Sequence, residues 1–524
     1  MRLLAPLLVL FGLVFAAMDA VVGGQTVGAH ARLSDTVPAV DSVVEVPPRE
    51  VELTFDEPVR PVPQGIRILS PDGRDVASGE ATRSADGRSL TVPVDPAGAR
   101  GSFTVSYRVV STDGHVVAGS WVFSVGERTA TAASADERAD PWSRGVEVLG
   151  RMLASAGAFL ALGTVVVAGL DDTAPLGSSL VRRRAVLVAG TVTLSVGGLL
   201  VLVGAAGLYA GSLAGASGAL LDVVGATSTG WVVLARVAVA VVLLVCSLVP
   251  AVLRRMPVVV AVLAVAATAA PALGGHAVSS SVPVLASTLV AVHLVTGACW
   301  LGALAVLSLR WAEDRELLGG YSDVAVVAAP LVVVSGLGGA WIQVGGAGDL
   351  LGSTYTRLLL AKALLAAVLL VLGWMNRRAL ARAAGTALDL ASSVRLETVL
   401  GVAVLAVSAV LVVTPPPADV PDPVRAEAAS GELVARVLVE PGVAGPNRVE
   451  LRYVDAAGRP VSVDATDLRI SRAGVEPRRV EVRAVDPSTA VATDVVLTPG
   501  PWRFEVTVVA RGTPSRFELE VMVR

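Results

Sequence analysis

Four histidines are the residues of this 524-residue chain whose types and spacing best suit metal chemistry. His30 becomes the first residue if an export signal is removed after Ala29. An N-terminal histidine can bind a metal through its α-amine and ring Nδ1, and a nitrogen from His115 would complete a T-shaped set that suits tetragonal Cu(II). Asp113, two positions before His115, points to the same side and can add an oxygen. Alternatively, this stretch is only a turn before a strand, and His30 belongs to a disordered terminus.

The other two histidines and both cysteines lie in or beside long apolar runs. His276 stands at the end of the fourth run, and His293 is about ten residues into the fifth, or roughly 15 Å deep. Ionisable groups inside a membrane are costly and mark functional pathways, so both are candidate copper ligands; the alternative is a hydrogen bond between helices. Thiolates of Cys246 and Cys299 would suit Cu(I), although a buried cysteine is more often a small hydrophobic residue. We expect Lys362 to form an ion pair or to reach the outer surface.

The elements that position these residues begin with an export signal. Arg2 precedes an apolar stretch from Leu3 to Ala17, and small residues continue to Ala29. This pattern predicts a signal peptide over residues 1–29. The long distance from the apolar stretch to Ala29 leaves an uncleaved signal anchor as the alternative.

Residues 30–128 read as a small all-β domain. Short runs alternate at period two between Pro-Asp-Gly and Asp-Gly turns, which indicates an antiparallel sandwich or barrel. A linker rich in Ala, Thr, Ser and charge follows over residues 129–143. The expected strands are Val51–Phe55, Ile66–Ile68, Leu90–Val94, Phe103–Val109 and Trp121–Val125.

Residues 144–415 contain eight apolar runs, each long enough to span the hydrocarbon core, which predicts an eight-helix transmembrane bundle. The expected spans are about Val146–Leu170, Ala185–Ala210, Trp231–Leu253, Pro257–Leu273, Pro283–Leu309, Val324–Val344, Tyr355–Met375 and Leu396–Thr414.

Arginine bias gives the orientation of these spans. Arginines cluster in alternate loops, while the loops at 211–230, 274–282 and 346–354 have none. By the positive-inside rule the arginine loops are cytoplasmic, so both polar ends of the chain are extracytoplasmic. We therefore expect a multi-pass protein of the bacterial cytoplasmic membrane. The arginines are Arg182, Arg183, Arg184, Arg254, Arg255, Arg310, Arg315, Arg377, Arg378 and Arg382.

Residues 419–524 alternate again like strands and predict a second β-sandwich. We expect a structural or partner-binding role for it, because it contains no cluster of histidine, cysteine or methionine.

Composition excludes several functions. The chain is 53% hydrophobic and only 17% charged, against about 25% in soluble proteins. A net charge of -3 and a single lysine make nucleic acid an unlikely partner. The polar domains contain no cysteine, which excludes a disulfide framework there. Walker-type and Asp-Lys-Thr-Gly motifs are absent, so movement of a substrate would follow gradients or a partner.

Four stretches of the N-terminal domain resemble the CopC family of exported copper-binding proteins. They are His30–Leu33, Leu53–Val59, Tyr107–His115 and Gly119–Phe123. The resemblance implies a Greek-key β-barrel that holds Cu(II) by a histidine brace, with His30, Asp113 and His115 as ligands. It also implies that Glu57 lies beside the metal or binds it weakly. The methionine-rich Cu(I) site of some members looks absent, because no methionine stands between His30 and Met152.

The membrane region resembles CopD, the multispanning partner of that family, and residues 419–524 look like the YtkA-like β-sandwich. The CopD resemblance implies copper movement across the cytoplasmic membrane, usually described as import. It is carried by Gly275-His276-Ala277, His293-Leu294, Trp300-Leu301-Gly302, Ser335-Gly336-Leu337 with Trp341, Tyr355 to Lys362, and Asn376-Arg377-Arg378.

The sequence thus predicts a copper transport protein that captures Cu(II) outside and passes copper inward, with Cu(I) in the membrane domain as an option. One alternative is a membrane-tethered copper buffer or metallochaperone that hands copper to an extracytoplasmic chaperone or cuproenzyme. A copper mono-oxygenase is the less favoured alternative, and we expect no catalytic residues. The expected partners are the copper ion and membrane lipid.

Overall fold

The fold divides into a helical unit from the middle of the chain and a β unit from its two ends, each described by itself. In this computed structural model the described residues are 31, 33–40, 42–95, 98–111, 116–129, 140–170, 178–280, 282–310, 315–344, 353–382, 387–414, 423–440, 442, 445–472, 475–510 and 512–523.

The N-terminal domain is all-β, as predicted. Its strands form two four-stranded sheets, in the orders β1-β3-β6-β5 and β2-β8-β7-β4, and the chain crosses repeatedly between them in the manner of a Greek key. Inward-facing side chains of both sheets make one core, in which Phe103 stacks on Phe123 at 5.3 Å between ring centroids. The strands are β1 (Leu33–Val37), β2 (Val43–Val44), β3 (Glu50–Phe55), β4 (Arg60–Leu69), β5 (Thr82–Arg83), β6 (Ser89–Pro93), β7 (Gly101–Val110) and β8 (Val116–Val125).

The C-terminal domain is also all-β. Its sheets have the orders β14-β15-β11-β10-β9 and β13-β12-β16-β17, and all of its strand pairs are antiparallel. Alternation along each strand buries one face, and Trp502 and Tyr453 are the largest side chains of the core. The strands are β9 (Val424–Ser430), β10 (Leu433–Glu440), β11 (Gly445–Asp455), β12 (Ala465–Arg472), β13 (Val475–Val480), β14 (Arg483–Asp486), β15 (Thr489–Leu497), β16 (Gly500–Ala510) and β17 (Thr513–Val523).

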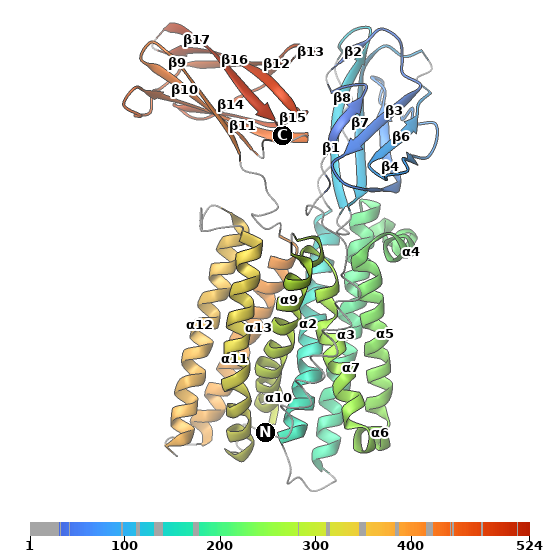
Figure 1. Ribbon diagram of the computed structural model, residues 1–524, viewed down its shortest axis with the longest axis vertical. Helices are drawn as coiled ribbons and strands as arrows, with labels where there is room; N and C mark the ends of the chain where they lie inside the picture. Colours follow the sequence, from blue (N-terminus) through green and yellow to red (C-terminus); the bar gives the residue numbers. More distant parts are fainter. Residues whose placement is uncertain are drawn as a thin grey trace. The chain divides into compact units, whose positions relative to one another are not determined.

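The helical unit is a bundle in which α2 lies between the other long helices (Figure 1). Seven described helical segments are long and apolar enough to cross a membrane, and they correspond to seven of the eight predicted spans. The eighth, Pro257–Leu273, is a shorter apolar helix in the same bundle. The helices are α2 (Pro141–Leu170), α3 (Ser178–Ala210), η1 (Leu213–Gly215), α4 (Ala216–Ala226), α5 (Ser228–Leu248), α6 (Pro250–Arg255), α7 (Pro257–Ala269), η2 (Ala270–Leu273), α8 (His276–Ser279), α9 (Pro283–Gly297), η3 (Ala298–Gly302), α10 (Ala303–Arg310), α11 (Arg315–Val344), α12 (Thr354–Ala381) and α13 (Ala387–Val412).

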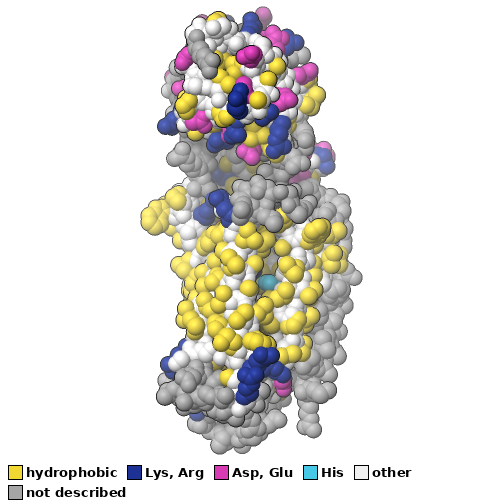
Figure 2. All heavy atoms as spheres, turned by 90° about the vertical axis from the view of Figure 1, so that its left-hand side faces the viewer, with side chains coloured by type: hydrophobic (Ala, Val, Ile, Leu, Met, Phe, Trp, Pro, Cys, Tyr) yellow, Lys and Arg dark blue, Asp and Glu magenta, His cyan; other side chains and the backbone are white. Residues whose placement is uncertain are grey.

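The outer surface of this bundle is hydrophobic between its two ends. Figure 2 shows apolar side chains covering the helices, with basic side chains at the two ends of this apolar band. Helix α12 has only a small share of its apolar stretch buried, and Val371 and Leu364 are among its exposed residues. A continuous apolar surface on helices long enough to cross a membrane suits the hydrocarbon layer of a bilayer.

Glycines bring α2 and α3 into direct backbone contact. A Cβ atom built on Gly157 would lie 2.3 Å from the backbone nitrogen of Leu194, and one on Gly197 would lie 2.3 Å from the backbone nitrogen of Ala154. Small residues at such crossings allow the close approach that drives helix association in lipid. The α2–α3 pair is therefore a rigid base for the rest of the bundle.

We expect Gly157→Ala to destabilise the helical unit by about 2 kcal/mol, because the added methyl group has no space against the α3 backbone. The matched control is Gly145→Ala on the same helix, where a Cβ meets nothing within 4 Å. Thermal unfolding in detergent measures the difference, and equal midpoints for the two variants would contradict the packing argument.

Asp140 caps the first helix of the bundle. Its Oδ2 accepts hydrogen bonds from the Ser143 hydroxyl at 2.6 Å, the Ser143 amide at 3.1 Å and the Leu213 amide at 3.0 Å. Pro141 follows at the first helical position, where a missing N–H costs nothing. These hydrogen bonds, the Ser143 hydroxyl first, lower the pKa of Asp140.

Because its pKa is depressed in the fold, Asp140 stabilises the protein above the ordinary aspartate pKa of about 3.9, and this contribution is lost as pH falls through the folded pKa. We expect Asp140→Ala to lower the unfolding midpoint at neutral pH and the deficit to shrink in acid. Asp140→Asn, which keeps an acceptor, should lose less at neutral pH. A pH series of thermal unfolding curves checks this, and a deficit independent of pH would refute it.

Candidate metal centres

The three predicted Cu(II) ligands, His30, Asp113 and His115, lie outside the described residues, but the strands on either side of them are described. Leu33 at the start of β1 pairs with Phe55 at the end of β3. Val110 and Val116, which end β7 and begin β8, pair with each other.

Glu57 lies on the segment that joins these two places. It follows Phe55 and precedes Arg60, which pairs with Val110 of β7. Its side chain is only 2% exposed, although a carboxylate is costly to bury. The register therefore brings Glu57, the start of β1 and the β7–β8 hairpin to the same end of the domain.

The Gly-Ser-Trp motif of β8 also has a structural explanation. Gly119 pairs with Tyr107 across the β7–β8 ladder, and a Cβ on Gly119 would lie 2.6 Å from the Tyr107 hydroxyl oxygen. The Tyr107 ring packs against Phe55 at 5.7 Å and Trp121 at 6.2 Å between centroids. The glycine thus makes room for an aromatic cluster that fixes the hairpin to β3.

In the helical unit, His293 on α9 faces α11. Its Nδ1 lies 3.0 Å from the carbonyl oxygen of Val332 and 3.4 Å from the hydroxyl oxygen of Ser335. The Ser335 hydroxyl itself donates to the carbonyl oxygen of Leu331 at 2.5 Å. A carbonyl oxygen can only accept, so the Nδ1 of His293 carries the proton.

This tautomer leaves the Nε2 of neutral His293 with a lone pair. A backbone carbonyl that holds Nδ1–H is the arrangement by which metal-binding histidines are commonly oriented, with Nε2 as the ligand atom. The hydrogen bond therefore fixes the tautomer of His293 and leaves Nε2 without a proton. The helix-to-helix hydrogen bond that sequence analysis raised as an alternative is present, and it leaves the second nitrogen available.

Gly336 lets the imidazole lie against α11. A Cβ on Gly336 would lie 3.0 Å from Cε1 and 3.2 Å from Nδ1 of His293. Both distances are tighter than ordinary van der Waals contact, so a side chain here would push the ring away. The Ser335-Gly336 pair thus sets the orientation of His293.

His293 is partly buried between α9 and α11. Lys362 on α12 lies near enough to act electrostatically on the ring. Of the two roles expected for Lys362, an ion pair has no partner among the described residues, and reaching the outer surface stays a prediction. Its positive charge would oppose a cation at His293 and favour a neutral imidazole.

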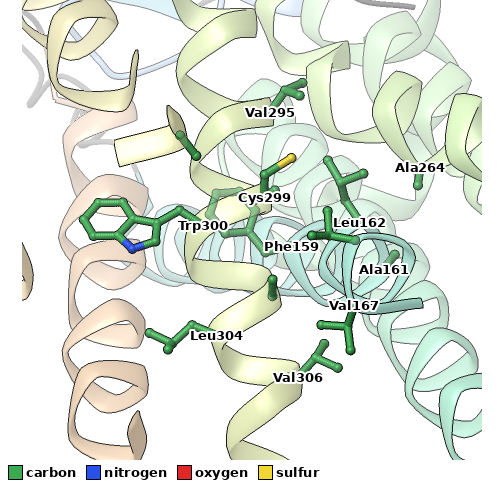
Figure 3. Close-up of a cluster of buried hydrophobic side chains, with 14 of the residues drawn as sticks. Phe159, Ala161, Leu162, Val167, Ala264, Val295, Cys299, Trp300, Leu304 and Val306 are labelled. Atoms are coloured by element: carbon green, nitrogen blue, oxygen red, sulfur yellow. The ribbon is translucent and has the colours of Figure 1, made fainter. Parts of the chain in front are cut away.

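His276 begins α8, directly after η2, and its side chain is outside the described set. Both cysteines are free thiols. Cys299 is buried in a cluster with Phe159, Leu162 and Val295 (Figure 3). Cys246 is partly buried and packs against the same cluster. In these apolar surroundings both cysteines pack as small hydrophobic residues do.

Three or more His, Cys, Asp or Glu side chains do not gather into a metal-binding group anywhere in the described parts of the chain. Sequence reasoning missed buried charged residues of the bundle, including Arg236 on α5, which donates to the carbonyl oxygens of Ala267 and Ala154, and Glu397 on α13, which is 2% exposed and accepts a hydrogen bond from the Asn376 side chain. A single charged residue inside an apolar run was the signal that could have found each of them.

Comparison with protein families assigns three regions. Residues 33–126 match the CopC domain, residues 139–282 match the copper resistance protein D-like N-terminal domain, and residues 315–411 match copper resistance protein D.

Relatives match either most of the chain or its first domain. The copper transport protein CutJ of Bacillus subtilis is 24% identical over 479 residues, which are 86% of this chain and 87% of CutJ. Copper resistance protein C of Xanthomonas campestris pv. juglandis is 34% identical over 103 residues, 18% of this chain and 80% of that protein. The crystal structure of CopC from Methylosinus trichosporium OB3b is 34% identical, with a TM-score of 0.17, over 19% of this chain and 100% of that one. This chain therefore carries a CopC domain and both copper resistance protein D regions in one polypeptide, and it is homologous to CutJ.

Proposed function

We propose that this protein binds copper outside the bacterial cytoplasmic membrane and transports it across that membrane, inward. The observation that carries the proposal is the union of a CopC domain with both copper resistance protein D regions in one chain that aligns with 87% of CutJ. A binding domain fused to a membrane bundle raises the local concentration of its cargo at the entrance of that bundle.

The proposed capture site holds Cu(II) through the amine and ring of His30, the ring of His115 and an oxygen of Asp113. Glu57 supports it, since its buried carboxylate lies at the same end of the domain as the strands that flank the ligands. This site requires His30 to be the first residue, so residues 1–29 are proposed to be a cleaved signal peptide.

The proposed membrane path uses His276 and His293. The Val332 carbonyl holds the Nδ1–H of His293, which supports Nε2 as the ligand atom. Neutral imidazole binds Cu(II) and is also compatible with Cu(I), whereas Cys246 and Cys299 would serve only Cu(I). We propose His293 as the principal ligand within the bundle and copper as the only cargo.

The proposed domain order is the capture domain over residues 30–128, a linker over 129–143, the transport domain over 144–415 and an extracytoplasmic β-sandwich, similar to YtkA-like domains, over 419–524. The arginine-rich loops support a cytoplasmic location for the end of the bundle that carries them. The loops without arginine and both β domains would then be extracytoplasmic.

A copper pulse tests transport against sequestration. Cells expressing the full chain are compared with cells carrying an empty vector, and copper is measured separately in the cytoplasm and in the envelope. We expect cytoplasmic copper to rise with the full chain. A rise confined to the envelope would make the protein a tethered copper buffer or chaperone and would overturn the transport proposal.

A further inference from the structure

Glu397 is an acidic side chain deep within the helical unit. It lies five residues into the apolar part of α13 that begins at Ser392, and only 2% of its surface is exposed. Two other acidic side chains of the bundle pair with arginines: Glu147 with Arg151 at 2.5 Å and Asp323 with Arg377 at 3.3 Å. Within the described residues Glu397 has no such partner, although a buried carboxylate without a cation is costly.

One polar side chain from a neighbouring helix contacts this carboxyl group, and two further polar side chains lie in the same part of the bundle. The Asn376 side chain of α12 donates a hydrogen bond to Oε1, and Gly373, one turn earlier, leaves Oε2 uncovered because a Cβ there would lie 3.8 Å away. On α11, Tyr321 is 8% exposed and interacts electrostatically with Glu397. Trp300 of η3 lies beside the Tyr321 hydroxyl and projects away from Cys299 (Figure 3).

The Tyr321 hydroxyl is the second independent feature of this cluster. It is buried, and the side chain of Trp300 lies within hydrogen-bonding reach of it. The indole N–H can only donate, so the hydroxyl O–H can still be donated to another group. A protonated Glu397 can donate its O–H to this hydroxyl, whereas the ionised form can only accept.

The chemistry of the cluster suits a proton better than copper. Glu397, Asn376 and Tyr321 supply oxygen atoms and no sulfur or imidazole, whereas copper in either oxidation state prefers nitrogen or sulfur. Binding a proton removes the buried charge of the carboxylate, and releasing it restores a negative charge that attracts a cation in the bundle.

We propose that Glu397 is a proton-binding site whose protonation is coupled to copper transport. This inference rests on the proposed function, because the ion exchanged with the proton is the copper that the bundle is proposed to carry. In each cycle the Glu397 carboxyl group loses one proton to water as a copper ion enters the bundle, and the carboxylate takes up one proton after the ion leaves. The proton balances part of the copper charge.

Among the described residues, the other charged groups near α13 do not pair with Glu397. Arg377 pairs with Asp323, and the Arg378 guanidinium lies 3.8 Å from the ring centre of Trp374. On α2, which also packs on α13, the titratable side chains Arg144, Glu147 and Arg151 all lie within the first 11 residues. On α10 the only one is Arg310, at its end, and that side chain is outside the described set. Arg395 of α13 itself is exposed, and Tyr321 of α11 is close enough to interact electrostatically with Glu397.

The test uses the full-length protein in liposomes with a copper-sensitive dye inside and imposed pH gradients. We expect the gradient to change copper uptake by the unaltered protein at least about tenfold, which corresponds to about 1.4 kcal/mol in the barrier. Glu397→Gln should respond little to the gradient, whereas Asp323→Asn should respond as the unaltered protein does. Two results would overturn the proton site. One is a Glu397→Gln variant whose copper uptake responds to the pH gradient as strongly as that of the unaltered protein. The other is an unaltered protein whose copper uptake does not respond to the gradient.

A second measurement does not require transport. Infrared difference spectra of the detergent-solubilised protein should show loss of a protonated carboxyl band when copper is added, and Glu397→Gln should lack this band. Its absence from the unaltered protein would refute the inference. Absence of copper uptake under every gradient, with the infrared signal present, would refute the proposed transport and leave the proton site standing.

Discussion

Full-length protein with His30→Ala is expected to bind Cu(II) at least about 100-fold more weakly than the unaltered protein, a loss of about 2.8 kcal/mol. The substitution removes the ring nitrogen that closes the chelate with the terminal amine, so the metal loses a ligand and the chelate ring. His115→Ala should also weaken binding strongly, and Glu57→Gln should have a smaller effect. Competition titration with a Cu(II) chelator in detergent measures the affinities.

Inserting a glycine before His30 distinguishes a histidine brace, which binds through the terminal amine and the ring, from a site that uses the ring alone. It keeps the His30 imidazole but moves the free amine one residue away, so the loss of affinity should approach that of His30→Ala. Asp75→Asn is the control, because Asp75 lies on an exposed turn where it pairs with Arg67. If the glycine insertion left the affinity unchanged, the terminal amine would not be a ligand and the brace would be wrong.

The sequence predicted the elements well where one periodicity dominates. The alternating run Leu433–Val439 became β10, with alternate side chains buried. Apolar runs became helices, but several helices extend past them: α12 continues through Arg377 and Arg378, because arginine is a good helix former and needs no apolar surroundings. Helix α4 was missed, since it lies in a loop that was defined only by its lack of arginine.

The surroundings of the candidate site could not be predicted, because they depend on how helices pack. The Val332 carbonyl and Gly336 are 39 and 43 residues from His293 along the chain, and only the α9–α11 contact brings them to its ring. Likewise, Asn376 is 21 residues from Glu397 along the chain, and the packing of α12 on α13 brings its side chain to the carboxyl group. Residue type identified His293 as a candidate, and the fold adds the tautomer and the orientation.

His293→Ala is expected to lower copper uptake into the cytoplasm at least about tenfold, or about 1.4 kcal/mol in the transport barrier, because the path loses its proposed ligand within the bundle. The double change with His276→Ala should lower uptake further. Cu(II) affinity at the external site should not change, since those ligands belong to a separate domain. Cytoplasmic copper after a pulse, at matched expression, gives the measurement.

Two glycine variants on α11 decide whether the orientation of His293 matters beyond its presence. Gly336→Ala places a methyl group 3.0 Å from Cε1 of the ring and should turn Nε2 away, so uptake should fall although the histidine remains. Gly339→Ala adds the same methyl group three residues later, where a Cβ meets nothing within 4 Å, and should leave uptake unchanged. Equal uptake by both variants, with His293→Ala inactive, would mean that the imidazole is needed but not in this orientation. Full uptake by His293→Ala would remove His293 from the path altogether.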